Sequence, residues 1–308
     1  MDRKLKKKII VIVGPTASGK SNLSVTLARE IGGEIISADS RQVYKELTIG
    51  TGKITKKEMR GVSHHLLDIV SLRQLTLRGV QGFTAAQFKS LAEKKIEEIT
   101  RRGKVPIVVG GTGFYIDTLL GTVSLPHVPP NLKLRKSLGN KSPESLFVML
   151  KKLDSRRARN IDKKNKVRLI RAIEIAKALG KVPKPKKRAP VYDVLKIGFA
   201  PDNTTLKQNI SIRLFARIKE GMIGEAKKLH QKGLSWKRME ELGLEYRYLA
   251  QFLQGKARKE ELVEKLTTEI WRYAKRQRRW FKRDTEILWY KPKDIRRIKK
   301  EIAQFLAK

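Results

Sequence analysis

The sequence predicts an α/β fold, in which a parallel sheet is interrupted by a helical insertion and followed by a helical C-terminal region. Short apolar runs, at residues 9–13, 33–38 and 105–109, alternate with helical periodicity in the first part of the chain. From residue 123 this alternation stops, and proline-bounded helical segments follow until residue 190. A further apolar run, at residues 194–200, then returns the chain to the sheet.

These breaks divide the 308 residues into three parts. Residues 1–122 are expected to form the first part of the α/β core, and residues 123–190 a separate helical lobe. Residues 191–308 are expected to complete the core and to add basic helices. A hydrophobic content of 40% is enough to give such a chain a large core.

Basic residues dominate the composition, with 70 Lys and Arg against 30 Asp and Glu and a formal net charge of +40. This excess favours a polyanionic partner, above all nucleic acid, while a lysine-rich compositional bias is the alternative explanation. The absence of cysteine excludes disulfides, Cys-ligated zinc and a thiol nucleophile. No apolar run approaches the roughly 18 residues of a membrane span, and the basic N-terminal segment lacks the apolar stretch of a signal peptide. We therefore expect a cytoplasmic protein without a membrane partner.

The loop after the first apolar run, Gly14-Pro-Thr-Ala-Ser-Gly-Lys-Ser21, fits the pattern G-x-x-x-x-G-K-[ST] at every fixed position. Its backbone N–H groups can cradle a di- or triphosphate, Lys20 can bridge the phosphates and Ser21 can hold Mg²⁺. The helix that follows adds the positive end of its dipole to the same anion site. The pattern predicts a P-loop NTPase-like core that binds a di- or triphosphate, with phosphate-binding residues Gly14, Thr16, Ala17, Ser18, Gly19, Lys20 and Ser21.

Polar residues follow two further predicted strands. Because the carboxyl ends of neighbouring parallel strands face one crevice, we expect Asp39 beside the phosphate loop, as a general base or a second metal ligand. The alternative is that its carboxylate only caps the following segment. Thr112, in the glycine-rich segment 110–115, can donate its hydroxyl to a phosphate oxygen, although a plain tight turn is the competing interpretation. His64 and His65 have no third ligand at metal-site spacing, so we interpret them as structural or as lining the crevice.

Three longer segments predict helices. Residues 83–102 form an amphipathic pattern that Thr84 can cap. Residues 206–221 carry Arg213 and Arg217 one turn apart, and either could reach a diphosphate. The last long predicted helix, residues 256–284, has seven Lys or Arg and four aromatic residues between positions 271 and 283. Such a surface is typical of nucleic-acid binding, although some of the aromatic side chains are expected in the core.

Several motifs occur in the order found in tRNA dimethylallyltransferases, also called isopentenyl-diphosphate:tRNA isopentenyltransferases, and the chain resembles this family over nearly its whole length. The motifs are the phosphate loop, residues 39–44 (DSRQVY), His64-His65, residues 83–88, residues 110–115, Leu125-Pro126 and residues 272–277 (RYAKRQ). The resemblance implies a P-loop-type core with a helical lobe, and a need for Mg²⁺. It implies transfer of a dimethylallyl group from dimethylallyl diphosphate to N6 of the adenosine just 3′ of the tRNA anticodon, giving N6-dimethylallyladenosine and diphosphate.

The resemblance also implies residue roles. It makes Asp39 the general base near the target amine, and Thr112 and Arg213 groups that stabilise the leaving diphosphate. It implies that Gln42 recognises bases around the target. The expected tRNA-binding residues are Ser40, Arg41, Gln42, Lys275, Arg276 and Gln277, and the expected complex is one anticodon stem-loop on a monomer.

Three places depart from the family pattern. Asn209 stands where a second arginine is usual, residues 243–246 read Gly-Leu-Glu-Tyr, and residues 161–168 loosen an Asn-Asp-x-x-Arg pattern. These departures weaken residue-level statements about the grip on tRNA and leave the chemical core intact.

Three other functions fit parts of the sequence. A P-loop small-molecule kinase would use the same loop and a strand-end carboxylate, but it would leave the cationic aromatic helix unexplained. A prenyltransferase of free adenine nucleotides is the second, and the net charge argues against it. A non-catalytic RNA-binding regulator is the third, and it would leave Lys20, Asp39 and Thr112 without a purpose.

Overall fold

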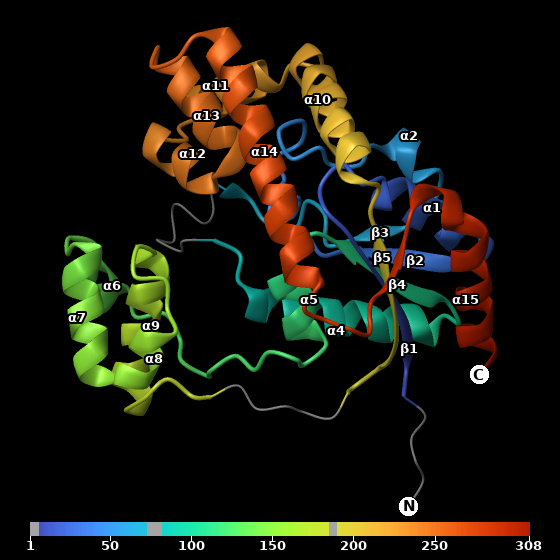
Figure 1. Cartoon of the computed structure of the whole chain (residues 1–308), viewed down its shortest axis with the longest axis horizontal. Coiled ribbons are helices and arrows are strands. Elements are labelled where there is room, and N and C mark those ends of the chain that lie inside the picture. Colours follow the sequence, from blue (N-terminus) through green and yellow to red (C-terminus); the bar gives the residue numbers. More distant parts are fainter. Residues whose placement is uncertain (1–5, 73–81, 185–189) are drawn as a thin grey trace, which may run out of the picture. The chain divides into compact units, whose positions relative to one another are not determined.

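The computed structural model describes residues 6–72, 82–184 and 190–308. Its contacts divide the chain into two compact units (Figure 1). The larger unit combines Met1–Leu120 with Ala189–Lys308, and the smaller unit is Gly121–Arg188.

The larger unit is built on a six-stranded sheet in the order β3-β2-β4-β1-β5-β6, with every pair of neighbours parallel. The strands are β1 (Lys8–Val13), β2 (Gly33–Ser37), β3 (His64–His65), β4 (Val105–Gly110), β5 (Asp193–Phe199) and β6 (Leu288–Tyr290). The predicted α/β class is confirmed, and the four predicted strands are present. The short edge strands β3 and β6 were not predicted.

The register of the sheet brings three loops together. Val13 at the end of β1 pairs with Gly110 of β4 and with Gly198 of β5, while Ser37 of β2 pairs with Val109. The segments that leave β1, β2 and β4 therefore start side by side at the carboxyl edge of the sheet, where open α/β sheets bind their ligands.

Helices cover the sheet and form a second core beside it. Those packed on the sheet are α1 (Lys20–Glu30), α4 (Ala85–Arg101), α5 (Gly113–Leu119) and α15 (Ile295–Ala307), while α2 (Lys56–Met59) contacts α1. In α4 the spacing of Phe88, Ala92, Ile96 and Ile99 gives one buried face, and Thr84 forms the expected cap, with a reciprocal bond to Gln87. Helix α15 belongs to the basic helices expected at the end of the chain, although its bounds were not predicted, and the short 3₁₀ turn before it, Pro292–Asp294, was not predicted.

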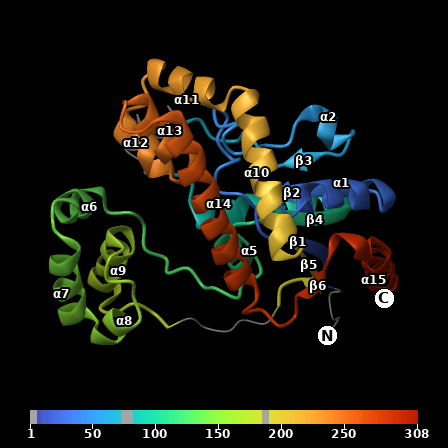
Figure 2. The same ribbon diagram turned by 45° about the horizontal axis from the view of Figure 1, so that its top comes forward.

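The second core joins α10 (Asn203–Lys219), α11 (Met222–Gln231), α12 (Trp236–Leu242), α13 (Leu244–Leu253) and α14 (Lys259–Phe281). Helices α10 and α14 lie side by side, as the turned view in Figure 2 shows. They correspond to the predicted helices 206–221 and 256–284. In the described part of the chain, no helix is both long enough and apolar enough to cross a membrane.

The smaller unit is a helical lobe with its own core. It consists of α6 (Leu132–Gly139), α7 (Pro143–Leu153), α8 (Ser155–Arg159) and α9 (Lys166–Leu179), so the predicted short helices are present. Leu146, Leu150 and Leu169 are fully buried between these helices. Glu174, only 2% exposed, accepts hydrogen bonds from Arg135 at 2.8 and 2.9 Å and also pairs with Arg171. The carboxylate thus pairs with two arginines and offsets part of their charge inside a strongly basic lobe.

A buried carboxylate also stabilises the edge of the sheet in the larger unit. Glu34 of β2 is 4% exposed and accepts hydrogen bonds from His65 and Arg102 at 2.7 Å and from Lys104 at 2.9 Å. Burial works to raise the pKa of Glu34, but the hydrogen bonds from these three partners outweigh it and lower the pKa to about 2. His65 therefore has the structural role that the sequence suggested.

We expect Glu34→Gln to lower the free energy of unfolding at pH 7 by about 2–3 kcal/mol, because a lowered carboxyl pKa stabilises the folded state in proportion to the shift. The stabilisation is present above the pKa of the unfolded chain, about 4.3, and is lost as pH falls towards 2. Urea unfolding followed by tryptophan fluorescence from pH 7 to pH 3 measures it, and the variant should show the flatter profile.

The matched control is Glu93→Gln, which removes a carboxylate from an exposed ion pair with Lys89 on α4. Equal losses of stability in the two variants would contradict the role of Glu34.

Candidate active site

The phosphate loop connects β1 to α1, and its glycines are required by close contacts. A Cβ on Gly14 would lie 2.2 Å from the Phe199 carbonyl oxygen of β5, so no larger residue fits there. Gly19 has a left-handed φ of 89° at the start of α1. Lys20 donates a hydrogen bond to the Pro15 carbonyl at 3.1 Å, which folds the lysine back over its own loop.

A cavity of about 360 Å³ lies at the carboxyl edge of the sheet. Its lining includes many of the predicted site residues, from the phosphate loop, from the segment after β2 and from two helices of the C-terminal part. These are Thr16, Lys20 and Ser21 of the phosphate loop, Asp39, Ser40, Arg41 and Gln42 after β2, and Arg213, Arg276 and Gln277 of α10 and α14. Ala17, Ser18 and Gly19 instead line a neighbouring hollow that also contains Lys20, Ser21 and Arg213.

Two cations in this cavity carry charges that the protein itself neutralises only in part. Burial and the nearby Arg213 guanidinium lower the pKa of Lys20 to about 8, against a smaller opposing effect of Asp39. Burial, and next the charge of Arg217, likewise lower the pKa of Arg213. An anion between the two side chains would relieve this repulsion, so the cavity is electrostatically prepared for a phosphate group.

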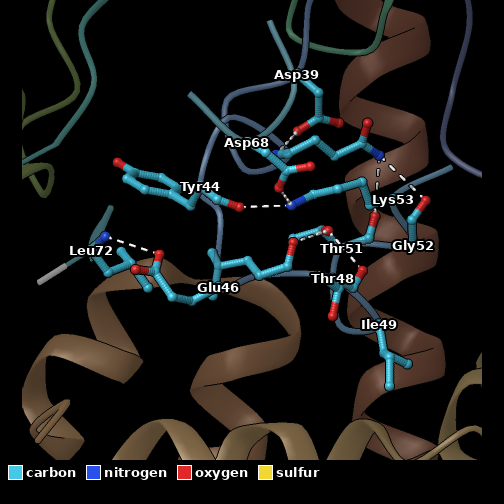
Figure 3. Close-up of polar contacts among 12 residues, drawn as sticks. Asp39, Tyr44, Glu46, Thr48, Ile49, Thr51, Gly52, Lys53, Asp68 and Leu72 are labelled. Atoms are coloured by element: carbon cyan, nitrogen blue, oxygen red, sulfur yellow. Dashed lines mark hydrogen bonds and ion pairs between the residues drawn. The ribbon is translucent and has the colours of Figure 1, made fainter. Parts of the chain in front are cut away.

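Asp39 both caps a turn and lines the cavity. Its Oδ1 accepts the backbone N–H of Arg41 at 2.8 Å and of Gln42 at 3.3 Å, which fixes the turn after β2 (Figure 3). The capping interpretation therefore holds for one oxygen. The other oxygen, Oδ2, has no hydrogen-bond partner within residues 6–72, 82–184 and 190–308, and so one acceptor of the carboxylate is available to a ligand.

Thr112 holds this turn in place. Its hydroxyl oxygen accepts the backbone N–H of Ser40 at 3.1 Å, and its own N–H donates to the Ala38 carbonyl at 3.3 Å. Thr112 is not part of the cavity lining. Its contact with a diphosphate stays a prediction, whereas its support of the segment that carries Asp39 is a feature of the structure.

Gln277 differs most from its expected place at a tRNA surface. The side chain is 6% exposed and its amide joins two loops: Oε1 accepts the Thr16 N–H at 2.8 Å, and Nε2 donates to the Gly111 carbonyl at 3.0 Å. A Cβ on Gly111 would lie 2.1 Å from this Nε2, so the glycine is needed for the approach. Gln277 thus ties α14 to the phosphate loop, and both polar ends of its amide are already used within the protein.

The exposed side of α14 does carry the expected basic and aromatic residues. Lys275 and Arg276 are exposed, and each lies over an aromatic ring of the same helix, Trp271 at 5.5 Å and Tyr273 at 5.8 Å. Lys207 of α10 approaches the same Trp271 ring at 5.1 Å. Tyr273, which the sequence analysis did not single out, lines the cavity with Asp39, and burial followed by the charge of Asp39 raises its pKa.

Residues that depart from the family pattern contribute to the site in other ways. Asn209 donates to the Ala17 carbonyl of the phosphate loop at 3.3 Å. Glu245 forms an ion pair with Arg217 at 3.1 Å, and Tyr246 packs in the second core. In the lobe, Asn165 caps α9 by accepting the N–H of Arg168. Glu245 was not predicted as a site residue, because in the sequence it stands out only as a departure from the family pattern.

The family model, the curated relatives and the solved structures that are similar to this chain all point to one family. A family model described as IPP transferase matches residues 42–284. The tRNA dimethylallyltransferase 2 of Treponema denticola is 43% identical over 283 residues, covering 90% of this chain and 92% of that protein. The tRNA dimethylallyltransferase of Anoxybacillus flavithermus is 39% identical over 289 residues, covering 92% and 90%.

Solved structures agree with these relatives. The full-length tRNA isopentenylpyrophosphate transferase of Bacillus halodurans is similar with a TM-score of 0.72 and 34% identity, covering 98% of this chain and 97% of that one. A eukaryotic dimethylallyltransferase acting on tRNA has a TM-score of 0.76 at 27% identity, covering 92% and 74%.

The charge state of Lys20 gives a pH dependence that can be measured. We expect the affinity for inorganic pyrophosphate to fall as pH rises through about 8, because Lys20 then loses its proton in the free protein and no longer attracts the anion. Isothermal titration calorimetry between pH 7 and pH 9.5 measures the decline.

Lys20→Ala should weaken pyrophosphate binding at pH 7 by about tenfold or more. It should also remove the fall in affinity that deprotonation of Lys20 causes. Titration of pyrophosphate itself is common to both proteins, so the wild-type and variant curves are compared directly. Parallel curves would exclude Lys20 as the titrating group.

Proposed function

The chain belongs to the IPP transferase family, and we propose that it transfers a dimethylallyl group from dimethylallyl diphosphate to N6 of the adenosine immediately 3′ of the anticodon in tRNA. The observation that carries the proposal is a single cavity with two kinds of group. Lys20 and Arg213 provide cations for a diphosphate, and Asp39 provides a carboxylate beside them. A group transfer from a diphosphate to a weakly acidic amine needs both.

The cations act on the leaving group. As the bond between the allylic carbon and the diphosphate oxygen breaks, negative charge grows on the diphosphate. Lys20, Arg213 and the N–H groups of the phosphate loop stabilise that charge without rearranging, because the fold already holds them. Loss of one such contact is expected to cost about 2–4 kcal/mol of transition-state stabilisation.

The carboxylate acts on the acceptor. The exocyclic amine of adenine is a poor nucleophile, since its lone pair is delocalised into the ring. The nitrogen forms the new bond to the allylic carbon while Asp39 accepts the proton that N6 loses. The Asx turn to Arg41 and Gln42 holds the carboxylate during this step. The target base has to leave its stack to reach the cavity, as in other enzymes that modify bases.

Mg²⁺ fits this site as an ion held jointly by the protein and the substrate. Ser21, which carries a hydroxyl, lines the cavity, and the described residues contain no group of three His, Cys, Asp or Glu that could hold a metal alone. Mg²⁺ is commonly bound in this way, by one or two protein oxygens together with substrate phosphates and water. When bound, it neutralises charge on the leaving diphosphate.

The tRNA surface is proposed to include the exposed side of α14, with Lys275 and Arg276, and the segment Ser40, Arg41 and Gln42 at the cavity. The basic helices of the smaller unit are proposed to contribute further phosphate contacts. We propose that the protein works in the cytoplasm as a monomer, where its tRNA substrate is found.

The experiment that tests the function is incubation with radiolabelled dimethylallyl diphosphate, Mg²⁺ and either unmodified tRNA or AMP. We expect label in one anticodon-loop adenosine, located by nuclease digestion. Label in AMP alone would move the protein to the nucleotide prenyltransferases. No label in either, together with phosphate transfer from ATP to a small molecule, would support the kinase alternative.

Asp39→Asn should reduce the rate of dimethylallyl transfer by at least about 100-fold while leaving tRNA affinity within about twofold, because the amide keeps the acceptor of the turn and loses the base. Single-turnover kinetics and filter binding measure the two quantities. A large loss of affinity with a normal rate would rule out Asp39 as the base.

Arg276→Ala should weaken tRNA binding and reduce the slope of log affinity against log salt by about one, since a phosphate contact releases one counterion. Binding is measured at salt concentrations from 50 to about 300 mM. Lys94→Ala, on the exposed face of α4, is the control, and the assignment of Arg276 fails if the two variants keep the same slope.

A further inference from the structure

A turn formed by residues 48–52, which includes Thr48, Ile49, Thr51 and Gly52 in Figure 3, contacts several residues that line the cavity. The Gly52 carbonyl accepts hydrogen bonds from two predicted site residues, from Arg213 Nη2 at 2.8 Å and from Gln42 Nε2 at 3.3 Å. The Gly50 carbonyl accepts from Arg217 Nη1 at 2.9 Å. One short stretch of backbone therefore sets the positions of three side chains in the cavity.

The turn can approach Arg213 so closely only because residue 52 is glycine. A Cβ at Gly52 would lie 2.3 Å from Arg213 Nη2, and the backbone has a left-handed φ of 56°. A side chain at residue 52 would force the guanidinium to move, and the left-handed φ would strain it in any case. The contact between Gly52 and Arg213 is thus specific to this conformation of the turn.

The turn is held from outside the cavity by Glu225 of α11. The carboxylate accepts the backbone N–H groups of Thr48 at 3.0 Å, Ile49 at 2.8 Å and Gly50 at 3.0 Å, and it also accepts the Thr48 hydroxyl. The Tyr246 hydroxyl donates to the same carboxylate at 2.6 Å. Successive N–H groups around one anion form a strong, directional anchor.

The charged form of Glu225 is the one that the anchor requires. Burial works to raise the pKa of Glu225, but the hydrogen bonds from Thr48, Tyr246, Gly50 and Ile49 outweigh it and the pKa is lowered. A second anchor follows the turn directly. The buried Lys53 amine donates to the Tyr44 carbonyl at 2.7 Å and pairs with Asp68 (Figure 3).

From these contacts we infer that Glu225 is a positioning residue for the transfer reaction, acting through the turn at residues 48–52 on Arg213 and Gln42. The inference rests on the proposed function, which gives Arg213 the leaving diphosphate. Glu225 does not line the cavity. Its effect on the cavity side chains passes through the backbone carbonyls of Gly50 and Gly52.

The test is a double-mutant cycle in pyrophosphate binding. Glu225→Gln keeps the shape of the side chain but replaces one oxygen with an NH₂ group, which faces N–H donors and cannot accept from them. We expect it to weaken Mg²⁺–pyrophosphate binding by about tenfold. In an Arg213→Ala background the same substitution should change binding by less than about twofold, because its effect passes through Arg213. Glu93→Gln, on the surface of α4, is the charge-matched control.

A general loss of stability would look different. If Glu225 served the fold alone, Glu225→Gln would lower the melting temperature and its effect on binding would be the same with and without Arg213. Additive effects of the two substitutions overturn the inference, and so does normal binding by Glu225→Gln.

Failure of the proposed function would be visible separately, in the wild-type protein. If the wild type binds pyrophosphate but transfers no dimethylallyl group to tRNA, the function fails and the cycle still decides the role of Glu225. For a transferring enzyme, Glu225→Gln should lower kcat more than it raises the KM for tRNA, and the reverse pattern counts against positioning of Arg213.

Discussion

The site depends on two half-buried cations, Lys20 and Arg213, that line one cavity. Burial lowers the pKa of both; the charge of Arg213 adds to the effect on Lys20, and the charge of Arg217 adds to the effect on Arg213. Other contacts hold both side chains in place: Lys20 on the Pro15 carbonyl and Arg213 on the Gly52 carbonyl. Charge stabilisation of a leaving group is strongest when the donors need not move. The rest of the larger unit can be understood as the scaffold that keeps these charges in place.

The parts of this scaffold that follow local rules could be predicted. Strands β1, β2, β4 and β5 are five to seven residues long and each contains a short apolar run, and their parallel order makes the meeting of the phosphate loop with Asp39 a consequence of topology. Strands β3 and β6, with two and three residues, are too short to leave a periodic signal. Helix α15 has a clear apolar face, and it falls within the basic helices expected up to residue 308, although no bounds were predicted for a helix after residue 284.

Contacts between a side chain and a distant backbone group could not be predicted. Gln277 bonds to Thr16 across 261 residues, and Glu225 bonds to Gly50 across 175, and neither pairing leaves a pattern in the sequence. The motif resemblance predicted that Gln277 contacts tRNA. The side chain of Gln277 is buried, whereas those of its neighbours Lys275 and Arg276 are exposed. A motif identifies the helix that matters, whereas burial decides which of its residues face a partner and which hold the loops.

The cations of the cavity and the basic residues elsewhere on the chain suit two different kinds of substrate. A diphosphate is served by a few half-buried cations such as Lys20 and Arg213, which leaves almost all of the excess of +40 unexplained. Many of the remaining basic side chains are exposed, among them several on α14 and on the helices of the smaller unit. Exposed charge in water gains little from a small ligand but much from a polymer that releases counterions along its length. The composition and the cavity thus point to a small anionic donor and a large polyanionic acceptor, each bound by a different kind of electrostatics.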